Sequence, residues 1–360
     1  MDNGYTMNYN GKPSTFPWHR LPRELQLNIL SFLACRQGHT NRVESPSEKS
    51  TVKPYVGHVA KCATICRDWQ EYLENILFRK VTVHQKDLAG LHKISRCRTE
   101  RIQHLWLRIE LPPYCCRMCP GANNSLISEK SGLILDKALC NVLRVLRHWK
   151  ARNSSHPSGG LTLEISTHSP SDSQHEFRNI SFDDDEDGDE GPDVCTIDDP
   201  KHGWVGGRRV RQPDKMAVYD LFDSWEAYDP QIEKVEWSAP VVKHLLLRRQ
   251  TRRHILHTTL AHLLKRLPGL ESLKLEFWRK YGEVEFAWDL VTSKQFEFNF
   301  PRHVQRVTLF QDFDEDLDSM LSSGNSDLLG FIKTPNPVVG AGLAGLKNQQ
   351  HLCVSFIADA

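Results

Sequence analysis

The sequence predicts a small helical segment at the N-terminus followed by a larger α/β domain with parallel strands. Two observations support this fold class. Apolar residues recur at helical spacing from Leu21 to Leu33, and short strand-like segments alternate with helical ones beyond Phe78. One strand followed by one helix, repeated, is typical of a parallel sheet. The 360 residues are enough for about two domains.

The N-terminal part is expected to begin with a disordered polar tail, residues 1–16, that is rich in Asn and Gly. A helix of about 12 residues should follow, because Leu21, Leu25, Ile29, Phe32 and Leu33 share one helical face. Pro22 suits the first turn of that helix. Residues 36–57 are polar and predict an inserted loop, and helical spacing from His58 to Phe78 predicts one or two further helices.

The remainder should alternate strands with helices. Apolar residues with a period of about two predict strands at Gln103–Ile109, Leu161–Ile165, Val242–Leu247, Leu270–Phe277, Val304–Phe310 and His351–Ile357. Apolar residues on one helical side predict helices over Leu133–Trp149 and Thr251–Leu267.

Composition excludes several classes of protein. There are 46 Lys and Arg against 45 Asp and Glu, so the chain lacks the excess of basic residues expected of a nucleic-acid binder. No apolar run approaches the roughly 18 residues of a membrane span. The first residues do not resemble a signal peptide, so we expect an intracellular protein, cytoplasmic or nuclear, whose ten cysteines are reduced.

Two short sequences near the N-terminus resemble the F-box motif. The first is Leu21-Pro22-Arg23-Glu24 with Ile29 and Leu33 after it, and the second is Ile65-Cys66-Arg67-Asp68-Trp69. They are similar to the F-box pattern L-P-x-E, a spaced Ile and Leu, and then V-C-[RK]-x-W. The resemblance covers residues 17–80 and departs from the family in the polar insertion at 36–57.

The resemblance implies a three-helix F-box that binds the Skp-type adaptor of a cullin–RING ubiquitin ligase. Such a subunit is not itself an enzyme and needs no cofactor. The adaptor-binding residues that it implies are Leu21, Pro22, Glu24, Ile29, Leu33, Ile65, Cys66 and Trp69. Physical reasoning agrees in part, because so small a helical segment cannot enclose its own apolar surface. The alternative is that these residues pack against the rest of the chain, with Trp69 in the core.

Residues 81–360 resemble an irregular leucine-rich-repeat-like α/β domain. The strand at Leu270–Leu275 and its counterparts at His104–Ile109 and Val304–Leu309 are similar to L-x-x-L-x-L, although their spacing is unequal. Several segments, including Leu267-Pro268-Gly269-Leu270-Glu271, also resemble fungal F-box proteins with a divergent repeat region. The resemblance implies that this domain binds a protein substrate, whose identity stays open. An unrelated α/β sheet is the alternative.

An acidic insertion interrupts this domain at about 168–213. Its centre, residues 183–190, is almost entirely Asp and Glu, which predicts a solvated, disordered loop. A calcium site is the alternative, but the order of acidic residues does not match a twelve-residue calcium loop.

A basic cluster precedes or begins the helix that ends near Leu267. It consists of Arg248, Arg249, Arg252 and Arg253. One interpretation is a contact for an acidic or phosphorylated partner, or for the chain's own acidic loop. The other is a solvated helix face.

Two further motifs suggest cofactors, but their contexts argue against it. Cys115, Cys116 and Cys119 have half the spacing of a zinc site, without a matching second pair. Gly340–Gly345 matches G-x-G-x-x-G, yet too little chain follows for a nucleotide-binding unit. We therefore expect no metal and no cofactor. The alternatives to a ligase subunit are an F-box interaction scaffold that recruits no cullin and, less favoured, a cofactor-dependent enzyme.

Overall fold

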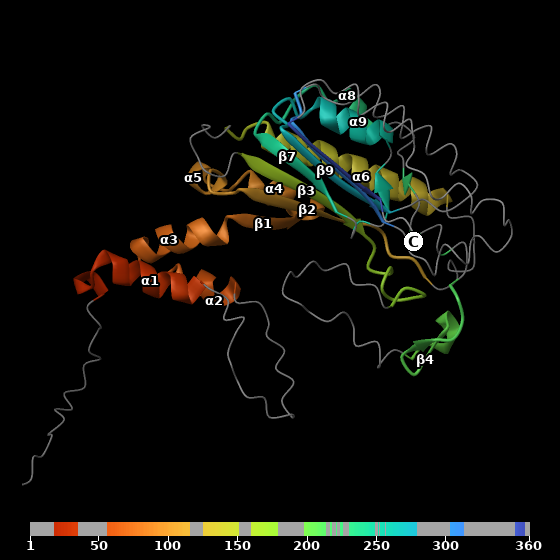
Figure 1. Ribbon diagram of the computed structural model, residues 1–360, viewed down its shortest axis with the longest axis horizontal. Helices are drawn as coiled ribbons and strands as arrows, with labels where there is room; N and C mark the ends of the chain where they lie inside the picture. Colours follow the sequence, from red (N-terminus) through yellow and green to blue (C-terminus); the bar gives the residue numbers. More distant parts are fainter. Residues whose placement is uncertain are drawn as a thin grey trace, which may run out of the picture. The chain divides into compact units, whose positions relative to one another are not determined.

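The computed structural model describes residues 18–34, 56–115, 125–150, 160–178, 198–213, 217, 221, 224–225, 230–248, 251, 253–255, 257–278, 303–312 and 350–356. The chain divides into two compact units, Met1–Leu77 and Phe78–Ala360 (Figure 1). Several predicted features lie outside the described residues: the tail at 1–16, most of the polar insertion, the acidic run at 183–190 and the glycine motif at 340–345.

The first unit is helical in its described part. It contains η1 (Trp18–Arg20), α1 (Arg23–Ala34), α2 (Val56–Cys62) and α3 (Arg67–Leu77). Leu30, Val59, Ala63 and Leu73 form its buried core, so each of the three α-helices contributes at least one side chain.

The start of α1 is held by a side chain inside the helix. Gln26 is buried, and its amide donates hydrogen bonds to the carbonyl oxygens of Trp18 and Leu21 at 3.0 and 3.1 Å. Glu24 lies in the first turn, where a carboxylate interacts favourably with the helix dipole. These contacts tie η1 to α1 and fix where the helix begins.

The second unit is built on a seven-stranded sheet. Its strands are β1 (Lys80–His84), β2 (His104–Glu110), β3 (Leu161–His168), β7 (Val242–Leu247), β9 (Ser272–Trp278), β10 (Arg306–Asp312) and β11 (His351–Phe356). Every neighbouring pair is parallel, and the strands lie in chain order (Figure 1). The predicted parallel α/β fold is therefore confirmed, with β1 as a strand that the sequence analysis missed.

Short and long helices connect these strands. They are η2 (Gln85–Asp87), α4 (Leu88–Leu91), α5 (Arg96–Thr99), α6 (Ser125–Leu146), α8 (Gln231–Lys234) and α9 (His257–Lys265). Buried apolar side chains from each of α4, α6, α8 and α9 join one core with Leu105, Leu107 and Ile109 of β2. These four helices therefore pack on the face of the sheet that carries those three residues.

The two ends of the predicted disordered insertion are ordered. Residues 198–213 contain η4 (Pro200–His202) and a small antiparallel pair, β4 (Trp204–Val205) with β5 (Arg208–Arg209). Phe177 and Trp204 are buried, which explains the difference from the expectation. Large apolar residues at the two ends of a polar segment can bury enough surface to order their surroundings. A further parallel pair joins β6 (Ser224–Trp225) to β8 (His254–Ile255).

Candidate functional site

The eight predicted adaptor-binding residues lie together in the first unit. Leu21 and Pro22 precede α1, Glu24, Ile29 and Leu33 lie on it, Ile65 and Cys66 immediately precede α3, and Trp69 lies in the first turn of α3. Leu33 and Trp69 both pack against the core formed by the three helices. The helical packing thus brings together two motifs that are more than thirty residues apart in the sequence.

Trp69 is a structural residue as well as a candidate contact. Its ring meets that of Trp18 edge to face, with ring centroids 4.9 Å apart. Such a pair contributes about 0.5–1.5 kcal/mol beyond the area that it buries. Trp69 is half-buried and packs against the helical core, so part of its side chain has the core role that the sequence analysis gave as the alternative to adaptor binding.

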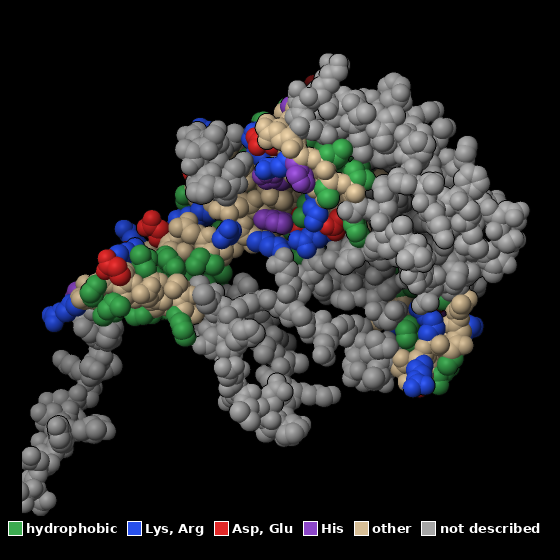
Figure 2. All heavy atoms as spheres, viewed as in Figure 1, with side chains coloured by type: hydrophobic (Ala, Val, Ile, Leu, Met, Phe, Trp, Pro, Cys, Tyr) green, Lys and Arg blue, Asp and Glu red, His purple; other side chains and the backbone are tan. Residues whose placement is uncertain are grey.

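Large apolar side chains are exposed on the outer side of α1. Leu25, Ile29 and Phe32 are 48%, 39% and 65% exposed, and they recur at positions i, i+4 and i+7. We call these three residues the α1 stripe; residues with this spacing share one face of a helix. Figure 2 shows hydrophobic side chains gathered over the helices of this unit. Sequence reasoning assigned Ile29 to the site but left out Leu25 and Phe32, although their helical spacing was recognised.

Other site residues are also accessible. Ile65 is 62% exposed immediately before α3, and Pro22, Glu24 and Cys66 are exposed. Leu21 and Leu33 are half-buried. The arrangement is suited to binding another protein, because exposed apolar groups beside polar ones are typical of an interaction surface.

The second candidate site, the arginine cluster, has internal partners. Arg253 is buried and forms a bidentate ion pair with buried Asp172. Arg248 lies 3.0 Å, Nε to Oε1, from Glu164. Arg249 and Arg252 lie outside the described residues. Arg248 and Arg253 precede α9 rather than lying on it, so the interpretation as a solvated helix face does not apply to them, and Arg253 is too buried to contact a partner protein.

Asp172 organises a buried polar network at the carboxyl end of β3. It accepts hydrogen bonds from the backbone N–H of Ser169 at 2.7 Å and from the Tyr114 hydroxyl at 3.2 Å. The Ser171 hydroxyl donates to the Tyr114 carbonyl oxygen at 2.9 Å. This network fixes residues 169–172 against the segment that follows β2, a structural role that the local sequence did not reveal.

A second carboxylate, Asp199, interacts with His202 and Arg178. Asp199 Oδ2 lies 2.8 Å from His202 Nδ1 and 2.8 Å from Arg178 Nη2. Burial acts to raise the pKa of Asp199, but the hydrogen bond and charge of His202 and the charge of Arg178 outweigh it and lower that pKa. The three side chains join residue 178 to the segment that begins at 198, across the undescribed acidic run.

The described residues show no metal centre. No group of three or more His, Cys, Asp and Glu side chains among them is arranged to hold a metal ion. Cys115 is exposed, while Cys116 and Cys119 lie outside the described part of the chain. In that same described part, no helix has both the length and the apolar character needed to cross a membrane.

Comparison with known proteins adds no family. No protein-family model matches the chain, and no curated protein matches it. The function of the chain is therefore inferred from its residues and their geometry.

Proposed function

We propose that the chain is the substrate-recognition subunit of a cullin–RING ubiquitin ligase. The first unit would act as an F-box that binds a Skp-type adaptor, and the second would hold a protein substrate. The observation that carries the proposal is the exposed α1 stripe. It lies on the helix that begins within the L-P-x-E motif, and Leu33 of that helix and Trp69 of the C-R-x-W motif pack against the same core.

Burying the α1 stripe and Ile65 against a partner would contribute favourably to binding. Fully burying a Leu, Ile or Phe side chain is worth about 1.5–3 kcal/mol. Leu25, Ile29, Phe32 and Ile65 are each only partly exposed, so each would contribute a fraction of that value. Together with polar contacts from Glu24, they supply several kcal/mol toward the cost of association, which is about 4–15 kcal/mol.

The second unit is suited to holding a substrate. Parallel strands in chain order, with described helices packed on one face, agree with a leucine-rich-repeat-like domain. Among the described residues, no helix packs on the other sheet face, where a substrate could bind. A subunit that holds both adaptor and substrate raises the effective concentration of the substrate near the conjugating enzyme. Its contribution to ubiquitin transfer is positioning, without a nucleophile of its own.

The test is co-purification with a Skp-type adaptor. Ile29→Ser with Phe32→Ser removes most of the α1 stripe while leaving buried Leu30 in place, so we expect adaptor binding to be lost and the helical circular dichroism to persist. Leu21→Ala with Pro22→Ala should also lose the adaptor. The matched control is Leu133→Ser, which removes a side chain 49% exposed on α6 of the second unit.

Three outcomes separate the hypotheses. Full adaptor recovery with the Ile29/Phe32 double variant would contradict the proposal. Adaptor binding without recruitment of a cullin would favour the interaction scaffold. Recovery of both adaptor and cullin with the wild-type chain would support a ligase subunit, provided that both are lost with the double variant.

A further inference from the structure

One row of side chains crosses all seven strands of the sheet. Residues paired in register on neighbouring parallel strands point to the same face. Following the register from β1 to β11 gives the polar row: Lys80, His104, Thr162, His244, Ser272, Arg306 and His351.

The polar row lies on the face opposite the helices. None of its seven side chains is buried. The next residues along the strands, such as Leu105, Leu163 and Leu273, are fully buried in the core that contains the helices. Because side chains alternate between faces along a strand, the polar row points away from that core. Figure 2 shows Lys, Arg and His side chains gathered over the sheet on the side in view.

The composition of the polar row favours anions. It contains the two permanent cations Lys80 and Arg306, three imidazoles and two hydroxyls, with no acidic and no apolar residue. Every one of these side chains can donate a hydrogen bond to an oxygen. Thr162, His244, Ser272 and Arg306 occupy adjacent strands, so a small hydroxyl lies between the imidazole and the guanidinium.

Nearby carboxylates already have partners in the chain. Glu164, on the strand beside His104, lies 2.6 Å from His104 Nε2 and 3.0 Å from Arg248 Nε. Glu271, next to Ser272, lies 2.9 Å from Lys243 Nζ. His104 is a member of the polar row, so this imidazole is already engaged by Glu164, while Arg248 and Lys243 balance much of the negative charge of the two carboxylates.

We propose that the polar row binds an extended acidic peptide segment of the substrate, crossing the strands with its carboxylates or phosphates on Lys80, His244 and Arg306. This inference rests on the proposed function, which makes the ligand a protein. Six spacings of about 4.8 Å make the row about 29 Å long, which an extended peptide of about nine residues would match.

Nucleic acid is a poorer match to the polar row. Its affinity grows with the number of phosphates that Lys and Arg neutralise, and the row offers only Lys80 and Arg306 as permanent cations, at β1 and β10. The remaining five side chains are hydrogen-bond donors that suit separated carboxylates better than a continuous phosphate backbone.

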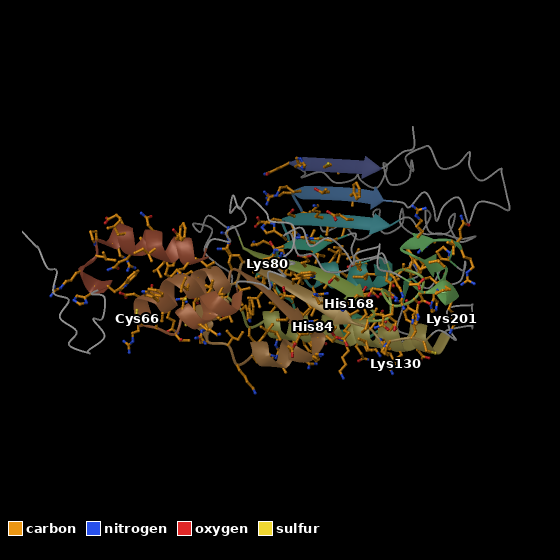
Figure 3. The ribbon with its side chains drawn as sticks, turned by 90° about the horizontal axis from the view of Figure 1, so that it is seen from below. Cys66, Lys80, His84, Lys130, His168 and Lys201 are labelled. Carbon is orange, nitrogen blue, oxygen red and sulfur yellow. The ribbon has the colours of Figure 1, made fainter. Side chains whose placement is uncertain are left out.

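The test measures peptide binding by the full chain without an adaptor. The probe is a fluorescein-labelled peptide of about nine residues that alternates Asp with Gly, compared with the same peptide carrying Asn and with an oligo-dT of similar length. Lys80→Gln with Arg306→Gln should weaken binding of the Asp peptide about tenfold, since each exposed pair contributes a modest share. The control is Lys130→Gln with Lys137→Gln, an equal charge change at exposed positions of α6; Figure 3 labels Lys80 and Lys130.

Three results of the peptide experiment would overturn the inference. Asp and Asn peptides that bind equally, or two double variants that weaken binding equally, would remove the polar row as a specific site. Tighter binding of oligo-dT with the same sensitivity to Lys80 and Arg306 would assign the row to nucleic acid. Adaptor binding is measured in parallel. If the wild-type chain binds the peptide but not the adaptor, the proposed ligase function is contradicted and the polar row is not. If the wild-type chain binds the adaptor but not the peptide, only the proposal for the polar row is contradicted.

Discussion

Arg253 and Asp172 form a buried bidentate ion pair across 81 residues of sequence. Arg253 is 4% exposed and Asp172 is fully buried, so neither charge is hydrated. The pair joins the segment before β8 to the segment after β3, and Asp172 also accepts hydrogen bonds from Ser169 and Tyr114. A carboxylate with so many partners is a structural centre of the second unit.

Asp172→Asn should destabilise the second unit by about 3–5 kcal/mol. The substitution removes the carboxylate charge that pairs with the buried guanidinium of Arg253, and breaking a buried ion pair by removing one partner costs about that much. Urea unfolding followed by tryptophan fluorescence measures the change.

The matched control for that measurement is Arg96→Gln. It breaks an exposed ion pair, 2.8 Å between Arg96 Nε and Glu100 Oε1, whose side chains are 66% and 50% exposed. An exposed pair contributes about 0–1 kcal/mol, so the unfolding midpoint should barely move. Equal shifts for Asp172→Asn and Arg96→Gln would show that the buried pair has no special role.

Substitutions at the adjacent residues Ile29 and Leu30 of α1 should have different effects on stability and on adaptor binding. Leu30 is fully buried in the helical core, so Leu30→Ala should destabilise the first unit by about 2–5 kcal/mol. Ile29 is 39% exposed, so Ile29→Ala should cost less than about 1 kcal/mol and instead weaken adaptor binding. Thermal unfolding and adaptor co-purification measure the two effects. A larger stability loss at Ile29 than at Leu30 would contradict the assignment of core and surface.

Much of the fold could be predicted from hydrophobic periodicity. The expected strand at Val242–Leu247 coincides with β7, and α6 and α9 overlap the expected helices at Leu133–Trp149 and Thr251–Leu267. The periodic spacing of apolar residues, near two in the strand and near 3.6 in the helices, predicts these elements because their inner residues face one continuous core. The missed strand β1 begins only three residues after α3 ends, where a change of period is hard to detect in so short a segment.

The long-range ion pairs could not be predicted in the same way. Asp172 lies in a segment whose polar composition indicated a loop, and Arg253 lies in a cluster that indicated an exposed basic surface. Only the fold brings them together, because residues 81 apart leave no periodic signal. The polar row has the same origin, since its seven members are related by strand register and not by spacing in the sequence.

Cys140 should resist alkylation in the folded protein. It is 6% exposed, and burial, assisted by the negative charge of Asp136, raises the pKa of its thiol to about 12. Only the thiolate reacts rapidly with iodoacetamide. At about pH 8, exposed Cys66, Cys97 and Cys115 should be labelled well before Cys140. Peptide mass spectrometry measures the order, and labelling in urea, where Cys140 should react like the others, is the control.

Acidification from about pH 7.5 to 5.5 should destabilise the second unit. Burial is the first cause that lowers the pKa of His168, His175 and His244 below 6.5, and Arg108, His202 and Arg306, respectively, add to it. The unfolded chain therefore binds more protons than the folded one as the pH falls through about 6.5. Stability that is fully present above that pH is lost as the pH falls toward the lowered folded values.

The histidine at the end of β3 offers the sharpest test of this dependence. His168 is paired in register with Glu110 of β2 and faces charges from Arg108, Asp172, Glu110 and His84. His168→Gln keeps a polar side chain but cannot gain a proton, so its urea midpoint should fall less between about pH 7.5 and 5.5 than that of the wild-type chain. Asp199, whose pKa is lowered from 3.8, remains ionised throughout this range and should not contribute. A midpoint that rises on acidification would contradict the expected direction, and an unchanged slope in His168→Gln would show that His168 does not contribute to the response.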